Sequence, residues 1–356
     1  MAVYTEVDHD EADALVRQLG LGALKALRGI EGGIENTNYF ATTERGEYVL
    51  TLFERLGPRQ LPYYLCLMEH LASRGIPVPA PVADPARVSA PAATPGQWQP
   101  APAADAPCAL LHTLAGKPAA VVDRLSGHSV LAPGPAHCAE LGRWLARMHL
   151  AGRDFPRVQP NLRGLDWWNE TAPVVLPHLD AADAELLRSE LAYQNHVAAS
   201  SAHAALPRGP VHADLFRDNA MFAADAADAA PRLSGVFDFY FAGTDSWLFD
   251  LAVSLNDWAI DLPTGRGDAG RTTALLEAYI QVRPLTGAER ALLPAMLRAA
   301  ALRFWISRLW DFHLPREASM LKAHDPTHFD RVLRLRAAAP AAVAAMSPRA
   351  SQPITA

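Results

Sequence analysis

Hydrophobic and polar positions follow a two-residue period near the N-terminus and a helical period over most of the remaining chain. The two-residue period predicts three β-strands, at residues 23–27, 37–42 and 48–53, and a glycine-containing connector between the last two is typical of a hairpin. The helical period predicts helices at 9–19 and 58–74, each followed by a glycine. The pattern therefore indicates a small β-rich region that carries one main helix.

The rest of the chain changes character. Residues 84–107 are rich in Ala and Pro and predict a long connection or a surface insert, and the apolar run 108–114 predicts a buried strand. From about residue 135 onward the pattern is mostly helical, with one interruption at 210–242. The Ala/Pro/Ser-rich tail beyond residue 337 is expected to fray or to be disordered.

These segments predict an α+β protein with two lobes. The small N-lobe, an antiparallel sheet with one main helix, is expected over residues 1–108 and includes the insert 84–107. The other expected parts are a connecting strand or hinge at 109–116, a larger, mostly helical C-lobe at 117–336, and the tail at 337–356. Ligands commonly bind between such lobes.

Composition excludes several classes of protein. With 50% hydrophobic residues, a net charge of −6 and a pI near 6.1, the chain does not have the Lys/Arg excess that nucleic-acid binding requires. It lacks the pattern of a signal peptide and any run of about 18 uncharged apolar residues, so we expect no membrane association. The three cysteines, Cys66, Cys108 and Cys138, are widely spaced and suit a reducing cytoplasm.

The most informative segment is Val211–Asn219, VHADLFRDN. It places Asp214 two residues after His212, and Asn219 five residues after the aspartate. This H-x-D-x-x-x-x-N spacing is that of a phosphotransferase catalytic loop, in which the aspartate accepts the proton of the attacking hydroxyl and the asparagine binds Mg²⁺.

A second carboxylate strengthens this interpretation. Asp238 lies in the apolar segment LSGVFDFYF, and a carboxylate buried there needs a cation or several donors. It could be a strand-edge aspartate that reaches solvent, but a metal ligand at the end of a strand is favoured. Asn219 and Asp238, from the two arms of one hairpin, could share a Mg²⁺ ion that bridges nucleotide phosphates.

The segments HADLFRDN, GVFDFYF and WLFDLA resemble the aminoglycoside phosphotransferase/choline kinase family, whose members are small-molecule kinases with a protein-kinase-like bilobal fold. Further matching segments are VYTEV, GGIENTNYF, EYVLTLFE, FDLAVSLNDW and RFWISRLWD, so the resemblance extends from residue 3 to residue 311. It implies ATP- and Mg²⁺-dependent phosphorylation of a hydroxyl group.

The resemblance also implies roles for individual residues. Asp214 would be the catalytic base, Asn219 and Asp238 the metal ligands, Asp250 a carboxylate that braces the catalytic loop through backbone N–H groups, and His212 a packed structural residue. The residues expected to contact ATP are Gly32, Gly33, Asn36, Thr37 and Asn38 at the phosphates, and Leu110, Leu111 and His112 through their backbone at the adenine. The alternative for the glycine-rich segment is an ordinary hairpin turn that binds no phosphate.

One departure from the family pattern concerns the phosphate-binding cation. The third strand of this fold usually supplies a Lys or Arg, but the matching position holds Thr51. Lysine is scarce: of 32 Lys and Arg residues only Lys25, Lys117 and Lys322 are lysines, and none is near Thr51 in sequence. Two arginines are candidates for the missing charge, Arg55 and Arg217. Glu69, the natural helix partner of that cation, is then expected to be a surface residue.

The expected acceptor is a small amino-acid alcohol, L-homoserine, as in threonine biosynthesis. Arg303 and Arg308 are candidates for binding its carboxylate, and Asp257 or Asp245 for its ammonium group, although Arg308 could pair instead along its own helix. A choline-like alcohol, a sugar or an aminoglycoside are alternative acceptors. Alternatives of other classes are a nucleotide-binding protein without catalysis and a metal-dependent hydrolase. His149 is expected to be packed rather than to bind a ligand.

Overall fold

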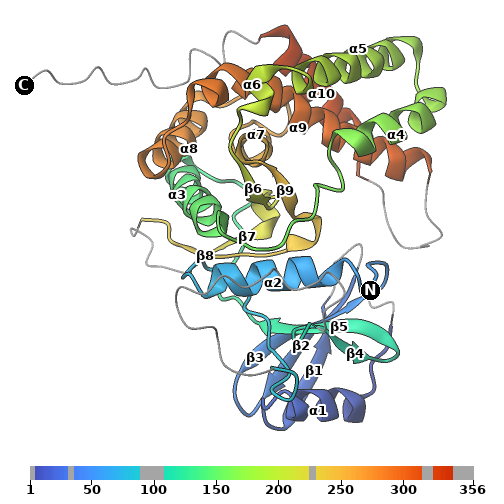
Figure 1. Cartoon of the computed structure of the whole chain (residues 1–356), viewed down its shortest axis with the longest axis vertical. Helices are drawn as coiled ribbons and strands as arrows, with labels where there is room; N and C mark the ends of the chain where they lie inside the picture. The colour runs from blue at the N-terminus through green and yellow to red at the C-terminus, as the bar shows by residue number, and fades with distance from the viewer. Residues whose placement is uncertain (1–4, 31–35, 89–107, 224–229, 315–323, 340–356) are drawn as a thin grey trace, which may run out of the picture. The chain divides into compact units, whose positions relative to one another are not determined.

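The computed structural model describes residues 5–30, 36–88, 108–223, 230–314 and 324–339 (Figure 1). The chain divides into two units. The first comprises Met1–Ser126, Asp154–Val158 and Gly235–Tyr240, and the second comprises Gly127–Arg153, Gln159–Ser234 and Phe241–Ala356. Most of the predicted insert 84–107, and the tail beyond residue 339, lie outside the described residues.

The first unit contains a five-stranded antiparallel sheet in the order β1-β2-β3-β5-β4. Its strands are β1 (Leu24–Gly29), β2 (Asn36–Thr43), β3 (Glu47–Phe53), β4 (His112–Leu114) and β5 (Lys117–Asp123). In the central strands Thr51 of β3 pairs with Asn38 of β2 on one side and with Ala120 of β5 on the other. The hairpin β2–β3 agrees with the sequence prediction.

Helices α1 (His9–Gln18) and α2 (Leu61–Ala72) lie on opposite faces of this sheet (Figure 1). Asp8 caps α1 by accepting the backbone N–H groups of Asp10 and Glu11. Leu50 and Leu52 belong to the hydrophobic cluster that buries the α1 side of the sheet. Because side chains alternate along a strand, Thr51 and Phe53 point to the opposite face.

The connection out of the first unit differs from the prediction of a hinge at 109–116. Residues 108–111 form a turn, in which the Leu111 N–H donates to the Cys108 carbonyl at 3.1 Å. The following β4 pairs with β5 in the sheet, so both strands belong to the first unit. The chain leaves this unit only after β5, at residues 123–127. The apolar run 108–114 was therefore wrongly interpreted as one connecting strand.

The second unit is mostly helical. Its helices are α3 (Pro135–Gly152), α4 (Leu165–Val175), η1 (Leu176–His178), α5 (Ala181–Ala198), α6 (Ser201–Ala204), η2 (Arg217–Asn219), α7 (Trp247–Trp258), α8 (Ala269–Val282), α9 (Gly287–His313) and α10 (Thr327–Ala338). Helix α3 packs along α8, where a Cβ on Gly142 would lie 2.3 Å from the Leu275 carbonyl oxygen, so only glycine permits this approach.

Short strands interrupt the helices at the predicted place. β6 (Arg208–Val211) pairs with β9 (Gly243–Ser246), and β7 (Ala220–Phe222) pairs with β8 (Leu233–Val236), which η3 (Phe239–Phe241) follows. The catalytic segment predicted from sequence thus connects β6 to β7. Within the described residues, no helix is both long enough and apolar enough to cross a membrane.

Helix α7 lies at the centre of the second unit. Ser246 caps it by accepting the Leu248 N–H at 3.2 Å, and every residue of the helix is buried. A helix that is buried all round can present polar side chains only to internal partners. Internal partners are therefore needed by its polar side chains near the catalytic loop, which are those of Asp250, Asp257 and Trp258.

Candidate active site

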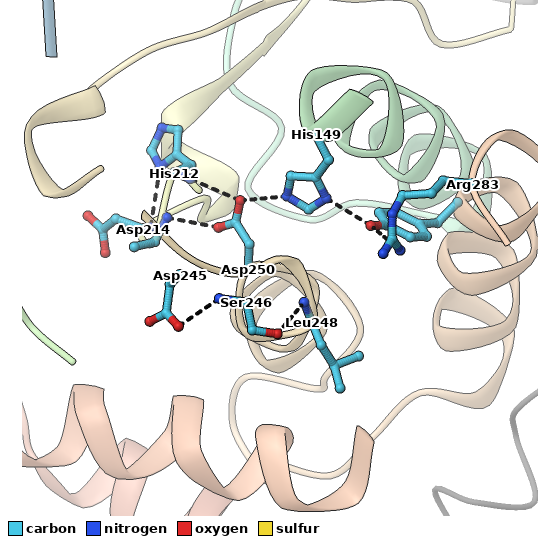
Figure 2. A network of polar contacts seen from close by, with 10 residues as sticks. His149, His212, Asp214, Asp245, Ser246, Leu248, Asp250 and Arg283 are labelled. Carbon is cyan, nitrogen blue, oxygen red and sulfur yellow. Dashed lines mark hydrogen bonds and ion pairs between the residues drawn. The ribbon is translucent and has the colours of Figure 1, made fainter. Parts of the chain in front are cut away.

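The catalytic loop begins with two backbone N–H groups that bind one buried carboxylate. Asp250 of α7 accepts the N–H of His212 at 2.9 Å and that of Ala213 at 2.8 Å (Figure 2). Burial opposes ionisation of Asp250, but the hydrogen bond from His149 and the N–H groups outweigh it, so the pKa of this carboxyl lies below its usual value. The structure thus places Asp250 where the resemblance implied a bracing carboxylate.

The backbone of this loop is in an unusual conformation. Ala213 has φ 64°, in the left-handed region that a residue with a Cβ disfavours. The two Asp250 hydrogen bonds hold the two peptide groups that precede the Ala213 Cα. Such strain persists only where surrounding contacts determine the conformation.

The ring of His212 supports the next residue. Its Nδ1 accepts the N–H of Asp214 at 3.3 Å, so this nitrogen carries no proton, and the residue is fully buried. His212 therefore acts inside the loop, as a structural residue. The Asp214 side chain, in contrast, is part-exposed and can meet a substrate.

Asn219 closes the loop onto Asp214. Its Nδ2 donates to the Asp214 carbonyl at 2.8 Å, which fixes the amide and turns its Oδ1 away from this contact. A side-chain amide held in this way presents a hard oxygen donor, the kind of ligand that a divalent cation such as Mg²⁺ prefers. The donor chemistry of Asn219 therefore fits the metal that the family implies.

Two further contacts from α7 hold the loop and account for two predicted residues. Asp257 Oδ2 accepts the Arg217 backbone N–H at 2.8 Å and its Nε at 3.1 Å. Arg217 Nη1 donates to the Leu131 carbonyl at 2.9 Å, and Nη2 donates to the Asp257 carbonyl. The Trp258 indole donates to the Leu215 carbonyl at 3.1 Å.

These contacts correct two predictions. Arg217 was a candidate for binding phosphate, but the structure buries it and directs all three of its side-chain nitrogens to Asp257 and Leu131. Asp257 was a candidate for binding the substrate ammonium, but it is buried against Arg217. Neither group can serve a ligand without breaking this buried pair, whose disruption would cost several kcal/mol, about 3–5.

Helix α9 brings a basic residue to the catalytic aspartate. Arg303 Nη1 lies 4.0 Å from Asp214 Oδ1, and its guanidinium rests on the Phe304 ring at 3.9 Å. Burial lowers the pKa of Arg308, while Asp257, Asp325 and Asp214 oppose this effect, so Arg308 also lies within the electrostatic range of Asp214. The structure therefore brings Arg303 close to Asp214, whereas Arg308 Nη1 donates to the Asp325 carbonyl at 3.3 Å.

Asp245, the other candidate for binding the ammonium group, forms hydrogen bonds and an ion pair with neighbouring residues. One oxygen accepts the Ser246 N–H at 2.6 Å (Figure 2), and the other accepts the Asn161 amide at 2.9 Å. Arg208 lies 3.4 Å from the first oxygen. These contacts neutralise the carboxylate and join β9 to neighbouring segments, so the structure gives Asp245 a structural setting.

Asp238 belongs to the first unit. It has φ 66°, so like Ala213 it lies in the left-handed region, and it immediately precedes η3. Burial and the nearby Asp238 charge both raise the pKa of Tyr240, and a hydrogen bond with Thr51 opposes them. Within the described residues, no group of three or more His, Cys, Asp and Glu side chains could hold a metal by itself.

Thr51, in the position that usually holds a cation, belongs to a neutral network. Its hydroxyl donates to Asn38 Oδ1 at 2.7 Å and is also hydrogen-bonded to Tyr240. Tyr240 packs edge-on against Phe53, with ring centroids 5.0 Å apart. Uncharged groups therefore occupy the space of the usual lysine.

One lysine lies near this strand in space, on the other face of the sheet. Lys117, at the start of β5, forms an ion pair with Glu54 and donates to the Thr5 hydroxyl at 2.7 Å. Glu54 is three positions after Thr51, so its side chain lies on the face of Leu52, opposite that of Thr51. Because Lys117 is paired with Glu54 on that face, it cannot replace the missing cation. The resemblance gave no signal for this pair, because its partners are 63 residues apart in sequence.

The predicted phosphate-binding segment is only partly described. Gly32 and Gly33 lie outside the described residues. Thr37 was expected to contact phosphate, but its side chain is buried and donates to Glu54 Oε1 at 2.6 Å on the α1 side, so its hydroxyl does not face the side of Thr51. Asn36 and Asn38 lie on the face of Thr51, and Asn36 Oδ1 is buried without a hydrogen-bond partner in the described part of the chain.

Arg55 and Glu69, the two remaining predicted residues near β3, are both exposed. Arg55 is exposed two residues beyond the end of β3 and makes no hydrogen bond or ion pair with the residues that the structure describes. Glu69 is exposed on α2, as the absence of a strand cation predicted. Arg55 therefore remains a candidate for the phosphates.

The residues predicted to contact adenine lie before the point at which the chain leaves the first unit. Leu110 is buried in the turn before β4, and His112 Nε2 lies 3.0 Å from the Val82 carbonyl oxygen. Leu110, Leu111 and His112 all precede β5, whereas the chain leaves the first unit after it. The prediction that these three residues form the connecting strand is wrong.

Several residues around the catalytic loop carried no recognisable sequence signal. His149 was expected to be packed, but its contact with Asp250 at 3.0 Å was not foreseen. Tyr279 and Trp258 were likewise missed, because each acts through a partner far away in the sequence. Arg283 was missed as well, because it reaches this network only through Tyr279. Only the H-x-D-x-x-x-x-N spacing made the loop itself visible.

The geometry defines a phosphotransferase of the protein-kinase-like class, and comparison with known proteins agrees. The sequence profile of the phosphotransferase enzyme family matches residues 26–285. The chain therefore belongs to this family.

Its curated relatives are more specific. A homoserine kinase of Polaromonas naphthalenivorans is 59% identical over 340 residues, which cover 96% of this chain and 99% of the relative. A homoserine kinase of Cupriavidus pinatubonensis is 54% identical over 351 residues, which cover 98% and 99%. The suspected relation to homoserine kinases is confirmed.

Solved structures agree on the fold. An amicoumacin kinase in complex with AMP-PNP and Ca²⁺ has a TM-score of 0.60 at 17% identity, covering 96% of this chain and 98% of that one. A choline/ethanolamine kinase family protein from Mesorhizobium loti has a TM-score of 0.57 at 16% identity, covering 96% and 100%. The predicted protein-kinase-like α+β fold is thus confirmed.

Proposed function

We propose that this protein transfers the γ-phosphoryl group of ATP to the hydroxyl of L-homoserine, and so acts as a homoserine kinase of threonine biosynthesis. The observation that carries the proposal is the catalytic loop. Asp250 fixes its backbone, Asp214 keeps a part-exposed carboxylate, and Asn219 holds its amide with Oδ1 available. The names of the curated relatives supply the acceptor.

In the proposed reaction, Asp214 accepts a hydrogen bond from the homoserine hydroxyl, orients it for in-line attack and receives its proton. Asn219 and Asp238 are the proposed Mg²⁺ ligands. When bound, the metal would neutralise charge on the nucleotide phosphates. Most of the rate enhancement is then expected from positioning and charge stabilisation rather than from proton transfer.

Arg303 and Arg308 remain the proposed partners of the homoserine carboxylate. Arginine suits this task because its planar guanidinium can bind a carboxylate through two parallel hydrogen bonds. Arg303 also lies 4.0 Å from Asp214 Oδ1, which supports a carboxylate-binding role next to the base. We expect Arg303→Lys to raise the KM for homoserine more than the KM for ATP.

For the nucleotide, we propose that residues 123–127 supply the backbone contacts to adenine and that Arg55 approaches the phosphates. Arg55 supports this proposal by its exposure and by the absence of a partner among the described residues. Arg55→Ala is expected to raise the KM for ATP. An unchanged KM for ATP would remove Arg55 from the site.

A coupled ADP-release assay tests the function. The acceptors are homoserine, serine, choline and an aminoglycoside, and Asp214→Asn is the matched control because it keeps shape and removes charge. We expect turnover with homoserine and a loss of about 10²–10⁴-fold in the variant. Release of ADP without an acceptor would indicate hydrolysis, and no release with any acceptor would contradict the proposal.

A further inference from the structure

A chain of buried polar contacts continues from the catalytic loop through Asp250 and His149 toward Arg283 (Figure 2). His149 Nε2 lies 3.0 Å from Asp250 Oδ2, and His149 Nδ1 lies 2.8 Å from the Tyr279 hydroxyl. The Tyr279 hydroxyl oxygen accepts from Arg283 Nη1 at 3.1 Å, and Arg283 Nη2 donates to Glu289 Oε1 at 2.6 Å. Helices α3, α7, α8 and α9 each contribute to this chain.

The chemistry of the donors sets the direction of every hydrogen bond. The ionised Asp250 can only accept, so His149 Nε2 must carry a proton. Burial lowers the pKa of His149, ahead of the opposing effect of Asp250, so the ring is neutral and its Nδ1 is an acceptor. The Tyr279 hydroxyl then donates to Nδ1 and accepts from Arg283, which has no acceptor atom of its own.

Burial keeps water away from these groups. His149, Asp250, Tyr279 and Glu289 are each 0% exposed. The Trp247 ring stacks on His149 with an interplanar angle of 7° and also lies under the Arg283 guanidinium at 4.6 Å. Loss of one hydroxyl would therefore leave a buried acceptor that water cannot reach.

Glu289 also connects this chain of buried contacts to the N-terminus of α9. Its Oε2 accepts the Thr286 N–H at 2.8 Å, which completes a capping box at the first turn of the helix. The same helix carries Arg303, which lies 4.0 Å from Asp214. The start of α9 is thus connected to the loop through side chains, and its middle reaches the loop directly.

We propose that Tyr279, Arg283 and Glu289 are positioning residues that hold the His149 ring with its Nε2–H directed at Asp250 and, through it, fix the orientation of Asp250 and the catalytic loop. The proposal rests on the proposed function, because its kinetic consequence is measured on phosphoryl transfer. None of the three residues contacts the reacting atoms. In the opposite tautomer, the lone pair of Nε2 would face the carboxylate and repel it.

The test compares Tyr279→Phe with Tyr39→Phe. Both changes remove one buried hydroxyl, but the Tyr39 hydroxyl donates to the Thr5 carbonyl at 2.8 Å in the first unit and has no contact with the loop. Arg283→Lys, which keeps the charge, is a second variant in case Tyr279→Phe does not fold. Nitrogen-15 NMR of the histidine rings reports the tautomer of His149, and steady-state kinetics report kcat and both KM values.

We expect the Nε2–H tautomer in the wild type. In Tyr279→Phe we expect the same tautomer, because Asp250 can only accept, but with a shifted Nδ1 resonance from the lost donor and a kcat lower by roughly 10-fold at unchanged KM for ATP. Tyr39→Phe should leave kcat and tautomer unchanged. An Nδ1–H tautomer in the wild type, or wild-type kcat in Tyr279→Phe, would overturn the proposal. If the wild type does not turn over homoserine, the proposed function fails, and the tautomer measurements then decide for or against the proposed positioning chain.

Discussion

Replacement of Asp250 by Asn tests how strongly α7 holds the catalytic loop. The buried carboxylate accepts from His212, Ala213 and His149. Asparagine keeps the shape but replaces one oxygen with an NH₂ group, so at least one N–H would face another donor. A hydrogen bond to a charged group contributes about 1.5–3 kcal/mol, and an unsatisfied buried donor costs about 1–3 kcal/mol. We therefore expect Asp250→Asn to lower the free energy of unfolding by roughly 3 kcal/mol.

The assay has two parts, urea unfolding and ADP release. We expect kcat to fall on the order of 100-fold at unchanged KM for ATP, because about 3 kcal/mol of loop positioning corresponds to this factor. Asp180→Asn is the matched control: Asp180 caps α5 by accepting the Asp183 N–H at 2.9 Å, and Asn caps equally well there. If Asp250→Asn resembled this control in both stability and kcat, the reasoning would be refuted.

Three further predictions concern other parts of the chain. Ala213→Gly should raise the free energy of unfolding by roughly 0.5–1 kcal/mol, because φ 64° strains alanine; a loss of stability in urea would contradict this. Burial, followed by Arg308 and Arg331, lowers the pKa of His328 from 6.5 to about 4. The unfolded state therefore binds more protons below pH 6.5, and stability should fall between pH 7 and pH 5 through this residue. In His328→Gln the fall in stability over this pH range should be smaller, and an equal slope would argue against it. The Cys66 and Cys108 sulfur atoms lie 3.9 Å apart, and their hydrogen bond lowers the pKa of the Cys108 thiol, whereas burial raises that of Cys138. Mass spectrometry after iodoacetamide treatment at pH 7 should find Cys108 modified before Cys138, and the reverse order would disprove the assignment.

The sequence was most informative where short spacing determines structure. The β2–β3 hairpin followed from alternation and a turn glycine, and the H-x-D-x-x-x-x-N spacing placed Asp214 and Asn219 in one loop, where Asn219 Nδ2 reaches the Asp214 carbonyl. Both features depend on residues close together in the chain. Local sequence rules apply best at that range.

The errors arose where distant segments meet. Arg217 and Asp257 are 40 residues apart, and no local pattern indicates that they pair. Thr37 follows the correct strand pattern, but its partner Glu54 is recognised only once the register is known. The apolar run at 108–114 fits a buried strand equally well as a turn followed by β4, because hydrophobicity alone does not reveal where a strand begins.

Phosphorus-31 NMR of the reaction mixture tests the central claim most directly. Wild-type protein is incubated with ATP, Mg²⁺ and L-homoserine, and Asp214→Asn serves as the matched sample. We predict a new phosphomonoester resonance that grows in step with ADP in the wild type and is nearly absent in the variant. ADP accompanied only by inorganic phosphate, or a phosphomonoester that forms equally fast in Asp214→Asn, would contradict the account.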